Sequence, residues 1–295
     1  KMIMESKDLY REIYDLVVKC CTDISPDVKR IIENAIEKES SPTARSMMQA
    51  MLDDVKLAQE KDKPLCQSPG FPAVYITFGD NVRPGNIKEL FAKALVTATK
   101  NGYMRPSMVH PLTRKNPGDN SGERVPNFEF DYIPEQGFLD IILSFKGCGA
   151  ELGNAMKVFT TAQLGKDYSG LKRFVLETVT KAGGVPCPPI ALGIGIGGQM
   201  DVACRLSRRA VSTRRWDDTN PDRLYASLES ELLQAINRLG IGPAGTGGDT
   251  TALAVKIEGS ATHTAIAPVA INFHCWTARR AGIRIYPDGK REEIL

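Results

Sequence analysis

An apolar run between residues 188 and 198, PPIALGIGIGG, constrains the fold of this chain more than any other feature of its sequence. The run is too short to cross a membrane, and prolines and glycines bound it, which is typical of a buried strand. Segments with helical spacing of apolar residues stand on both sides of it, at 168–184 and 201–211. This order of helix, strand and helix predicts an α/β protein.

The N-terminal part of the chain is expected to be helical. Between residues 7 and 60 apolar side chains recur at helical spacing, and Pro26 and Pro42 stand where new helices can begin. We therefore predict three helices within a helical segment that covers residues 1–62. Residues 105–127 are rich in proline, glycine, asparagine and charge, and we interpret them as a long functional loop.

Helix and strand patterns alternate through the remaining sequence. Further helices are predicted at 86–102 and 224–240, and strand-like runs occur at 74–78, 128–133, 138–145, 251–261 and 267–275. The sequence contains no internal repeat and no long linker. It therefore predicts one domain over residues 1–295, of the mixed α+β class, in which the N-terminal helical segment packs with a mixed sheet.

Charge and hydropathy exclude several kinds of partner. The 38 Lys and Arg residues nearly balance the 35 Asp and Glu residues, the net charge is +3, and no block of one sign appears, so nucleic acid is disfavoured as a partner. No apolar stretch is long enough to span a membrane, and the N-terminal residues form a charged amphipathic pattern rather than a signal peptide. We expect a cytoplasmic protein with no membrane partner.

Seven cysteines make an odd count, which favours reduced thiols over a disulfide framework. Three of them, Cys66, Cys187 and Cys275, lie in loop-like contexts rich in glycine or proline or at the end of a strand. Their wide spacing is unlike that of a zinc finger or a ferredoxin, and each could equally be a small buried apolar residue. The chain has only three histidines, so any transition-metal centre would depend on sulfur.

Two glycine-rich segments have ordinary structural explanations beside functional ones. Gly193, Gly195 and Gly198 match the spacing of a dinucleotide-binding turn, but a basic stretch, STRRWDD, follows where the fingerprint needs a strand ending in an acidic residue. The segment 239–255 could offer backbone amides to an anion or could be a plain turn from helix to strand. We do not predict a nucleotide site.

Several motifs, taken in their order along the chain, resemble the α subunit of class I fumarases and L-tartrate dehydratases. The resemblance runs from about residue 7 to about residue 281 and rests on PLCQSPG, RPSMVHPLTRKN, KGCGAELGN, AGGVPCPPIALGIGIGG, RLGIGPAGTGGDTTAL and THTAIAPVAINFHCWTARR. It implies the fold of the N-terminal domain of a class I fumarase. It also implies a hydro-lyase that interconverts small dicarboxylates, fumarate and (S)-malate first, with L-tartrate or mesaconate as alternatives.

The resemblance also implies a cofactor and its ligands. In that family three cysteines bind a [4Fe-4S] cluster, and the matching residues are Cys66, Cys187 and Cys275. The fourth iron has no protein sulfur, which leaves a Lewis-acid position for substrate.

Residue roles follow from the same resemblance. It places Gln67, Arg105 and Gly149 near the substrate, where an Arg can bind a carboxylate with two hydrogen bonds. It assigns proton handling or substrate orientation to His263, although from the sequence alone a structural histidine is the default.

One departure from the family pattern stands next to the first cysteine. The family reads Cys-Gln-Asp-Thr-Gly, whereas this chain has Ser68 and Pro69 in place of the acidic residue and the threonine. A serine cannot act as a carboxylate base at neutral pH, so we expect a different substrate or lower activity, with Ser68 in the catalytic position. Cys148 is a second departure, because it interrupts a run of glycines, and we expect a pocket residue or a spare thiol there.

The resemblance finally implies a partner. The rest of the active site lies in a region that follows this one in long-chain relatives, so we expect a separate β subunit and an α2β2 assembly. The alternative from another class is a non-catalytic subunit or binding protein that keeps the fold and lost turnover with the acidic residue.

Overall fold

The structure of the chain is a computed structural model that describes residues 6–66 and 68–295. The chain divides into two compact units, each built from separated stretches of sequence. Unit 1 contains the described residues of the ranges 1–25, 54–146 and 277–295, and unit 2 contains residues 26–53 and 147–276. Both units combine helices with a mixed sheet, so the predicted mixed α/β class is confirmed. The single domain over residues 1–295 stays a prediction.

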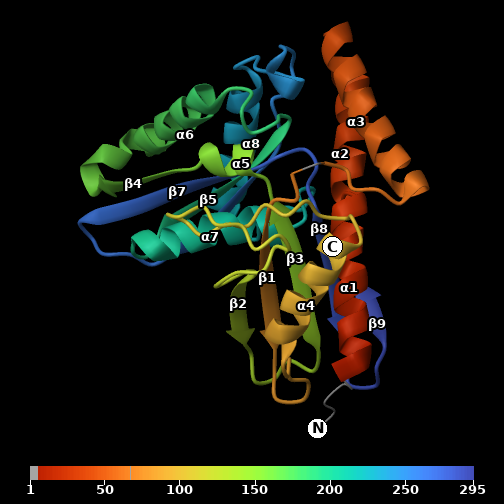
Figure 1. Cartoon of the computed structure of the whole chain (residues 1–295). Helices are drawn as coiled ribbons and strands as arrows, with labels where there is room; N and C mark the ends of the chain where they lie inside the picture. Colours follow the sequence, from red (N-terminus) through yellow and green to blue (C-terminus); the bar gives the residue numbers. More distant parts are fainter. Residues whose placement is uncertain (1–5, 67) are drawn as a thin grey trace. The chain divides into compact units, whose positions relative to one another are not determined.

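The strands of unit 1 are β1 (Phe71–Phe78), β2 (Asn127–Tyr132), β3 (Leu139–Lys146), β8 (Arg280–Ile285) and β9 (Arg291–Glu293). They form a five-stranded sheet in the order β2-β1-β3-β8-β9 (Figure 1). β1 pairs in parallel with β2 and antiparallel with β3, and the remaining pairs are antiparallel. The sequence patterns predicted β1, β2 and β3 but not β8 and β9.

Two helices supply the apolar core of unit 1. They are α1 (Ser6–Thr22) and α4 (Ile87–Lys100). Apolar residues recur three or four positions apart on both, so each helix presents one apolar stripe, and these stripes share a buried cluster with the sheet. Ile13, Val17, Phe91 and Leu95 are almost completely buried in this cluster.

Unit 2 contains a four-stranded sheet with helices on both faces. Its strands are β4 (Ala155–Thr160), β5 (Ile190–Gly197), β6 (Ala252–Ser260) and β7 (Ile266–His274), in the order β4-β7-β5-β6. Its helices are α2 (Pro26–Lys38), α5 (Cys148–Leu152), α6 (Ser169–Ala182), α7 (Met200–Thr213) and α8 (Arg223–Asn237), while α3 (Pro42–Lys61) begins in unit 2 and ends in unit 1. The predicted helix starts at Pro26 and Pro42 are confirmed. Three short 3-10 helices cover Thr161–Leu164, Lys166–Tyr168 and Pro243–Gly245.

The glycines of β5 are explained by the packing of α7. Figure 1 shows α6 and α8 on one face of the sheet and α7 on the other. The even-numbered residues of β5 enter the apolar core shared with α6 and α8. On the α7 face, a Cβ added to Gly193 would lie 1.8 Å from the Ser207 carbonyl oxygen, and one added to Gly195 would lie 2.0 Å from that of Ala203. These glycines let the helix approach the strand backbone, and their spacing needs no dinucleotide.

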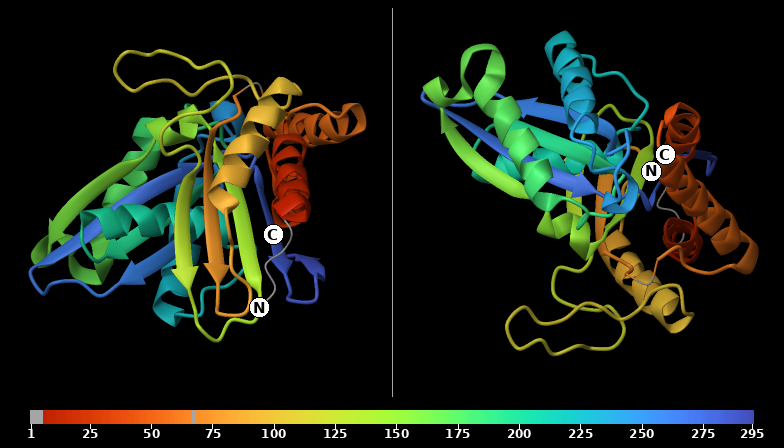
Figure 2. Two further views of the ribbon diagram at one scale, coloured as in Figure 1. Left: turned by 60° about the horizontal axis from the view of Figure 1, so that its bottom comes forward. Right: turned by 90° about the horizontal axis from the view of Figure 1, so that it is seen from above.

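The long loop predicted before β2 is present. Residues 101–126 contain no helix or strand, and Figure 2 shows this segment, in yellow, projecting away from the sheet of unit 1. Asn120 organises its base, since its side chain accepts hydrogen bonds from the Ser107 and Met108 amides and donates to the Arg105 carbonyl. Across the described residues, no helix is long and apolar enough to cross a membrane.

Candidate active site

Cys275 directly follows the last residue of β7 and is 7% exposed. The preceding His274 is completely buried, and its ring meets the Trp216 ring edge to face, with centroids 5.6 Å apart. The Trp216 amide donates to the Asp27 carboxylate at 2.7 Å. This packing fixes the strand end from which Cys275 emerges.

Cys187 lies in the turn between α6 and β5, with an exposed side chain and a φ of 57°. Its backbone carbonyl accepts a hydrogen bond from the Trp276 amide at 3.4 Å. The sheet register also brings the two segments together, because Ala191 of β5 pairs with His274 of β7. Cys187 and Cys275 therefore lie at the same end of the unit 2 sheet.

Gly149, in the short helix α5, packs against the same turn. A Cβ on Gly149 would lie 2.4 Å from the Val185 carbonyl oxygen, so only glycine fits here without moving the backbone that leads to Cys187. The neighbouring Cys148 is exposed. Unit 2 thus gathers Gly149, Cys187 and Cys275 around one turn.

Cys66 lies in unit 1, in the segment that precedes β1, and is half-buried. Three contacts within unit 1 fix this segment. The Leu65 amide donates to the Cys21 carbonyl at 2.9 Å, and Gly70, with a φ of +80°, lies so close to the Lys146 backbone that a Cβ would be 2.7 Å away. The buried Arg279 guanidinium donates to the Ser68 carbonyl.

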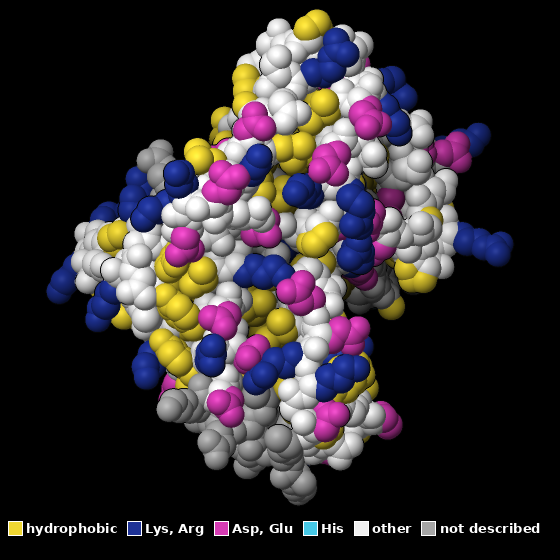
Figure 3. All heavy atoms as spheres, turned by 90° about the vertical axis from the view of Figure 1, so that its right-hand side faces the viewer, with side chains coloured by type: hydrophobic (Ala, Val, Ile, Leu, Met, Phe, Trp, Pro, Cys, Tyr) yellow, Lys and Arg dark blue, Asp and Glu magenta, His cyan; other side chains and the backbone are white. Residues whose placement is uncertain are grey.

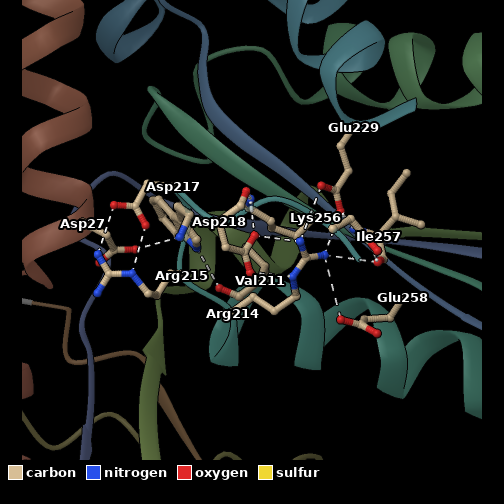
Figure 4. Close-up of polar contacts among 12 residues, drawn as sticks. Asp27, Val211, Arg214, Arg215, Asp217, Asp218, Glu229, Lys256, Ile257 and Glu258 are labelled. Atoms are coloured by element: carbon tan, nitrogen blue, oxygen red, sulfur yellow. Dashed lines mark hydrogen bonds and ion pairs between the residues drawn. The ribbon is translucent and has the colours of Figure 1, made fainter. Parts of the chain in front are cut away.

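A buried ionic cluster supports the sheet of unit 2 (Figure 4). Arg214, at the end of α7, donates hydrogen bonds to the Asp218 and Glu229 carboxylates, each at 2.7 Å. Lys256 of β6 also donates to the Asp218 carboxylate, at 2.7 Å. Burial raises the pKa of Asp218, but hydrogen bonds from Arg214 and Lys256 outweigh it, and the net pKa is lowered. For Glu258 burial prevails over the attraction of Arg214, so its pKa is raised.

No three His, Cys, Asp or Glu side chains within residues 6–66 and 68–295 converge closely enough to form a metal site by themselves. The segments of two predicted cysteines, Cys187 and Cys275, are hydrogen-bonded to each other in unit 2, while Cys66 belongs to unit 1. The donor set itself suits an iron–sulfur cluster, because thiolates favour such clusters and the segments of Cys187 and Cys275 are held side by side.

Comparison with known proteins decides the family. The sequence matches the fumarate hydratase (Fumerase) family over residues 10–284. The chain belongs to the fumarate hydratase family. This confirms the family predicted from the ordered motifs and, with it, the hydro-lyase class.

Relatives of this family chain differ in length and in name. It is 41% identical over 288 residues to the putative L(+)-tartrate dehydratase subunit alpha of Methanocaldococcus jannaschii, covering 95% of this chain and 99% of that one. It is 34% identical over 286 residues to the putative fumarate hydratase class I of Geobacillus stearothermophilus, covering 95% of this chain and 55% of that protein. It is also 29% identical over 268 residues to the L(+)-tartrate dehydratase subunit alpha of Escherichia coli K12, covering 90% and 87% of the two chains.

The substrate residues predicted for this fumarase-family chain lie in both units. Arg105 is exposed at the base of the long loop of unit 1, and Ser68 is half-buried in the Cys66 segment. Gln67 lies outside the described residues. Of the predicted substrate residues that the structure describes, only Gly149 shares a unit with Cys187.

His263 lies at the opposite end of β7 from Cys275, which belongs to the same unit. It is exposed in the turn between β6 and β7, where its ring nitrogen Nδ1 accepts a hydrogen bond from the Ala265 amide at 3.2 Å. Cys275 follows the other end of β7, a nine-residue strand. At the usual rise per residue, the two ends of this strand are about 26 Å apart.

The sequence did not indicate the long-range contacts of two residues, Arg279 and Glu39. Arg279 was part of a family motif, but nothing local indicated that its guanidinium would reach the Ser68 backbone, 211 positions away. Nothing in the sequence indicated that Glu39 would be buried, because an acidic residue at a helix end is usually solvated. On the face shown in Figure 3, Lys and Arg side chains are interspersed with Asp and Glu, in keeping with the near balance of charge.

Proposed function

We propose that this chain is the α subunit of an iron–sulfur hydro-lyase that adds water to, or removes it from, a small dicarboxylate. Family membership supports the reaction class. The observation that carries the proposal is the hydrogen bond from the Trp276 amide to the Cys187 carbonyl, since it joins two cysteine segments at one end of a buried sheet. Cys66 would supply the third thiolate.

A [4Fe-4S] cluster bound by these cysteines would supply a Lewis acid for departure of the substrate hydroxyl. The chain's own residues would bind and orient the substrate. Arg105 and Gln67 would hold carboxylate oxygens, and Gly149 leaves backbone space beside the Cys187 turn, where a side chain would intrude. Ser68 would occupy the position of the usual acidic residue, with its backbone held by Arg279.

Fumarate is our first candidate substrate, and L(+)-tartrate is the second. The second is favoured by the two relatives of similar length, which are both named as alpha subunits of L(+)-tartrate dehydratase. Their names also motivate a separate β subunit for this chain. The Geobacillus protein, of which this chain covers only 55%, has room for both parts in one polypeptide.

The position of His263 motivates an assembly with at least two copies of this chain. Because β7 separates His263 from Cys275 of the same unit, we propose that His263 serves the site of a second copy, as an α2β2 enzyme would allow. Coexpression of a His263→Asn chain with a Cys187→Ser chain tests this. Each variant alone should be inactive. The mixture should regain activity at sites that combine the intact Cys187 of the His263→Asn copy with the intact His263 of the Cys187→Ser copy. A mixture as inactive as its components would contradict the shared site.

The main experiment is anaerobic copurification with the β subunit, iron–sulfur reconstitution and an ultraviolet assay with fumarate, mesaconate and L(+)-tartrate. Turnover that requires Cys66, Cys187 and Cys275 would support the proposal and identify the substrate. A bound cluster without turnover would favour a non-catalytic subunit. The absence of any cluster after reconstitution would refute the ligand assignment.

A further inference from the structure

Glu39, at the C-terminal end of α2, is a buried carboxylate with three backbone donors. Its side chain is 2% exposed and lies in unit 2. The Asp249 amide donates to both of its oxygens, at 2.9 and 3.1 Å, the Thr250 amide donates at 3.0 Å and the Ser41 amide at 3.1 Å. Hydrogen bonds from amides to an ionised carboxylate are among the stronger ones in proteins.

The side chain of Asp249 in turn binds the backbone next to Glu39. Its carboxylate accepts a hydrogen bond from the Ser40 amide at 2.9 Å. The Ser40 side chain and this amide together lower the pKa of Asp249. We call this reciprocal pair the Glu39–Asp249 clamp. A groove of about 400 Å³ lies between α2, α8 and the start of β6, so apolar packing alone does not close this region. The clamp therefore provides the main specific attachment of the α2–α3 connection to the segment before β6.

That segment is the glycine-rich loop of residues 242–248. Gly248 fits tightly beside the clamp, since a Cβ there would lie 2.6 Å from the Ala44 Cβ and 3.1 Å from a Glu39 carboxylate oxygen. The loop closes on itself through the Gly247 amide, which donates to the Ile241 carbonyl at 2.8 Å. Its amides thus serve a turn from helix to strand, one of the two explanations that the sequence left open.

The loop in turn contacts the segment that carries Cys187. The Ala244 amide donates to the Pro188 carbonyl at 2.7 Å, and a Cβ on Gly245 would lie 2.9 Å from the Gly184 Cα. The Cys187 amide donates to the Gly184 carbonyl at 3.2 Å. The glycine-rich loop therefore abuts residues on both sides of Cys187.

We propose that Glu39 is a positioning residue for Cys187, acting through the glycine-rich loop. The conformation of Cys187 needs such support, because its φ of 57° is unfavourable for a residue with a side chain. With the clamp in place, the loop holds the residues before and after Cys187 and keeps the thiol aimed in one direction. This inference rests on the proposed function only in taking Cys187 as a cluster ligand.

Hydrogen exchange of the full iron-free chain tests the coupling without any turnover. In Glu39→Gln, an NH2 group replaces one acceptor oxygen and faces backbone N–H groups that it cannot accept from. The amide exchange rates should therefore rise about tenfold at residues 242–251 and also at residues 184–188. This is the size of effect expected for loss of a buried charged hydrogen bond. Glu37→Gln, at an exposed position on the same helix, is the matched control and should change neither segment. Asp249→Asn provides a milder variant should Glu39→Gln fold poorly.

A second readout is the alkylation rate of Cys187 measured against that of Cys148 in the same sample. Loss of the clamp should change this ratio, and the Glu37→Gln ratio should equal that of the wild type. If exchange rises at 242–251 while residues 184–188 and the Cys187 ratio stay unchanged, the positioning role is overturned. If Glu39→Gln changes exchange at residues 184–188 but the wild-type chain binds no cluster, only the proposed function is refuted. If the enzyme is active but Glu39→Gln leaves residues 184–188 and the Cys187 ratio unchanged, only this inference is refuted.

Discussion

The backbone amide of Trp276 donates a hydrogen bond to the carbonyl oxygen of Cys187 at 3.4 Å. This bond joins the residue after Cys275 to the turn between α6 and β5, so two cysteines far apart in sequence share one end of the unit 2 sheet. Trp216 and His274 are buried beside Cys275, and the Glu39–Asp249 clamp is the support that we propose for Cys187.

The glycines on the α7 face of β5 should be intolerant of any side chain. In Gly195→Ala the new methyl group would lie 2.0 Å from the Ala203 carbonyl oxygen, so α7 must move away from the sheet. We expect a loss of unfolding free energy of about 3 kcal/mol or more, at the upper end of typical overpacking costs. Gly137→Ala is the matched control, since nothing lies within 4 Å of its Cβ position. Urea unfolding of both variants decides the point, and equal stabilities would contradict the packing.

The cysteines should differ sharply in reactivity toward iodoacetamide at pH 8. Burial raises the pKa of Cys21 to about 12 and raises that of Cys20 as well, so neither forms much thiolate. Cys148 and Cys187 are exposed and should be modified first in the folded, iron-free chain. Peptide mass spectrometry after brief labelling gives the order. Early labelling of Cys20 or Cys21 would show that α1 does not pack as described.

Glu258 should make the chain less stable as the pH rises. Its pKa is raised in the folded state by burial, so its contribution is present below the ordinary glutamate pKa and is lost as the pH rises through the folded value. Glu258→Gln has no ionisable group at this position, so it does not lose this stability as the pH rises. The difference in Tm between variant and wild type should therefore grow from pH 4 to pH 7 in favour of the variant. A difference independent of pH would contradict the shift.

Ser68→Asp tests whether this position has a catalytic role. The substitution restores the carboxylate of the family pattern, and a positioned general base contributes about 10²-fold or more to a rate. We expect fumarate turnover of the αβ complex to rise at least tenfold. Ser68→Asn, of the same size but uncharged, should not raise it. If Ser68→Asp instead abolishes turnover of a substrate that the wild-type enzyme uses, the expectation is contradicted, and the serine side chain itself suits that substrate.

Local patterns of sequence determined a large part of the secondary structure. Prolines at 26 and 42 marked helix starts, and the run at 188–198 predicted β5, because propensity and periodicity depend on neighbouring residues. The sequence patterns did not predict β4, β8 or the three-residue β9. β4, with exposed Val158 and buried Phe159, has only six residues and no regular alternation of apolar and polar side chains, and β8 carries two arginines that the fold buries or pairs.

The sequence by itself determined the family, the candidate cysteines and most of the helices and strands, since all of these depend on short motifs and local patterns. Only the tertiary structure decided what meets in space. Glu39 reaches the amide of Asp249 across 210 positions, Arg279 reaches Ser68 across 211, and the sheet register sends His263 and Cys275 to opposite ends of β7. Such contacts depend on how strands pair and helices pack, and a residue's immediate neighbours carry no information about them.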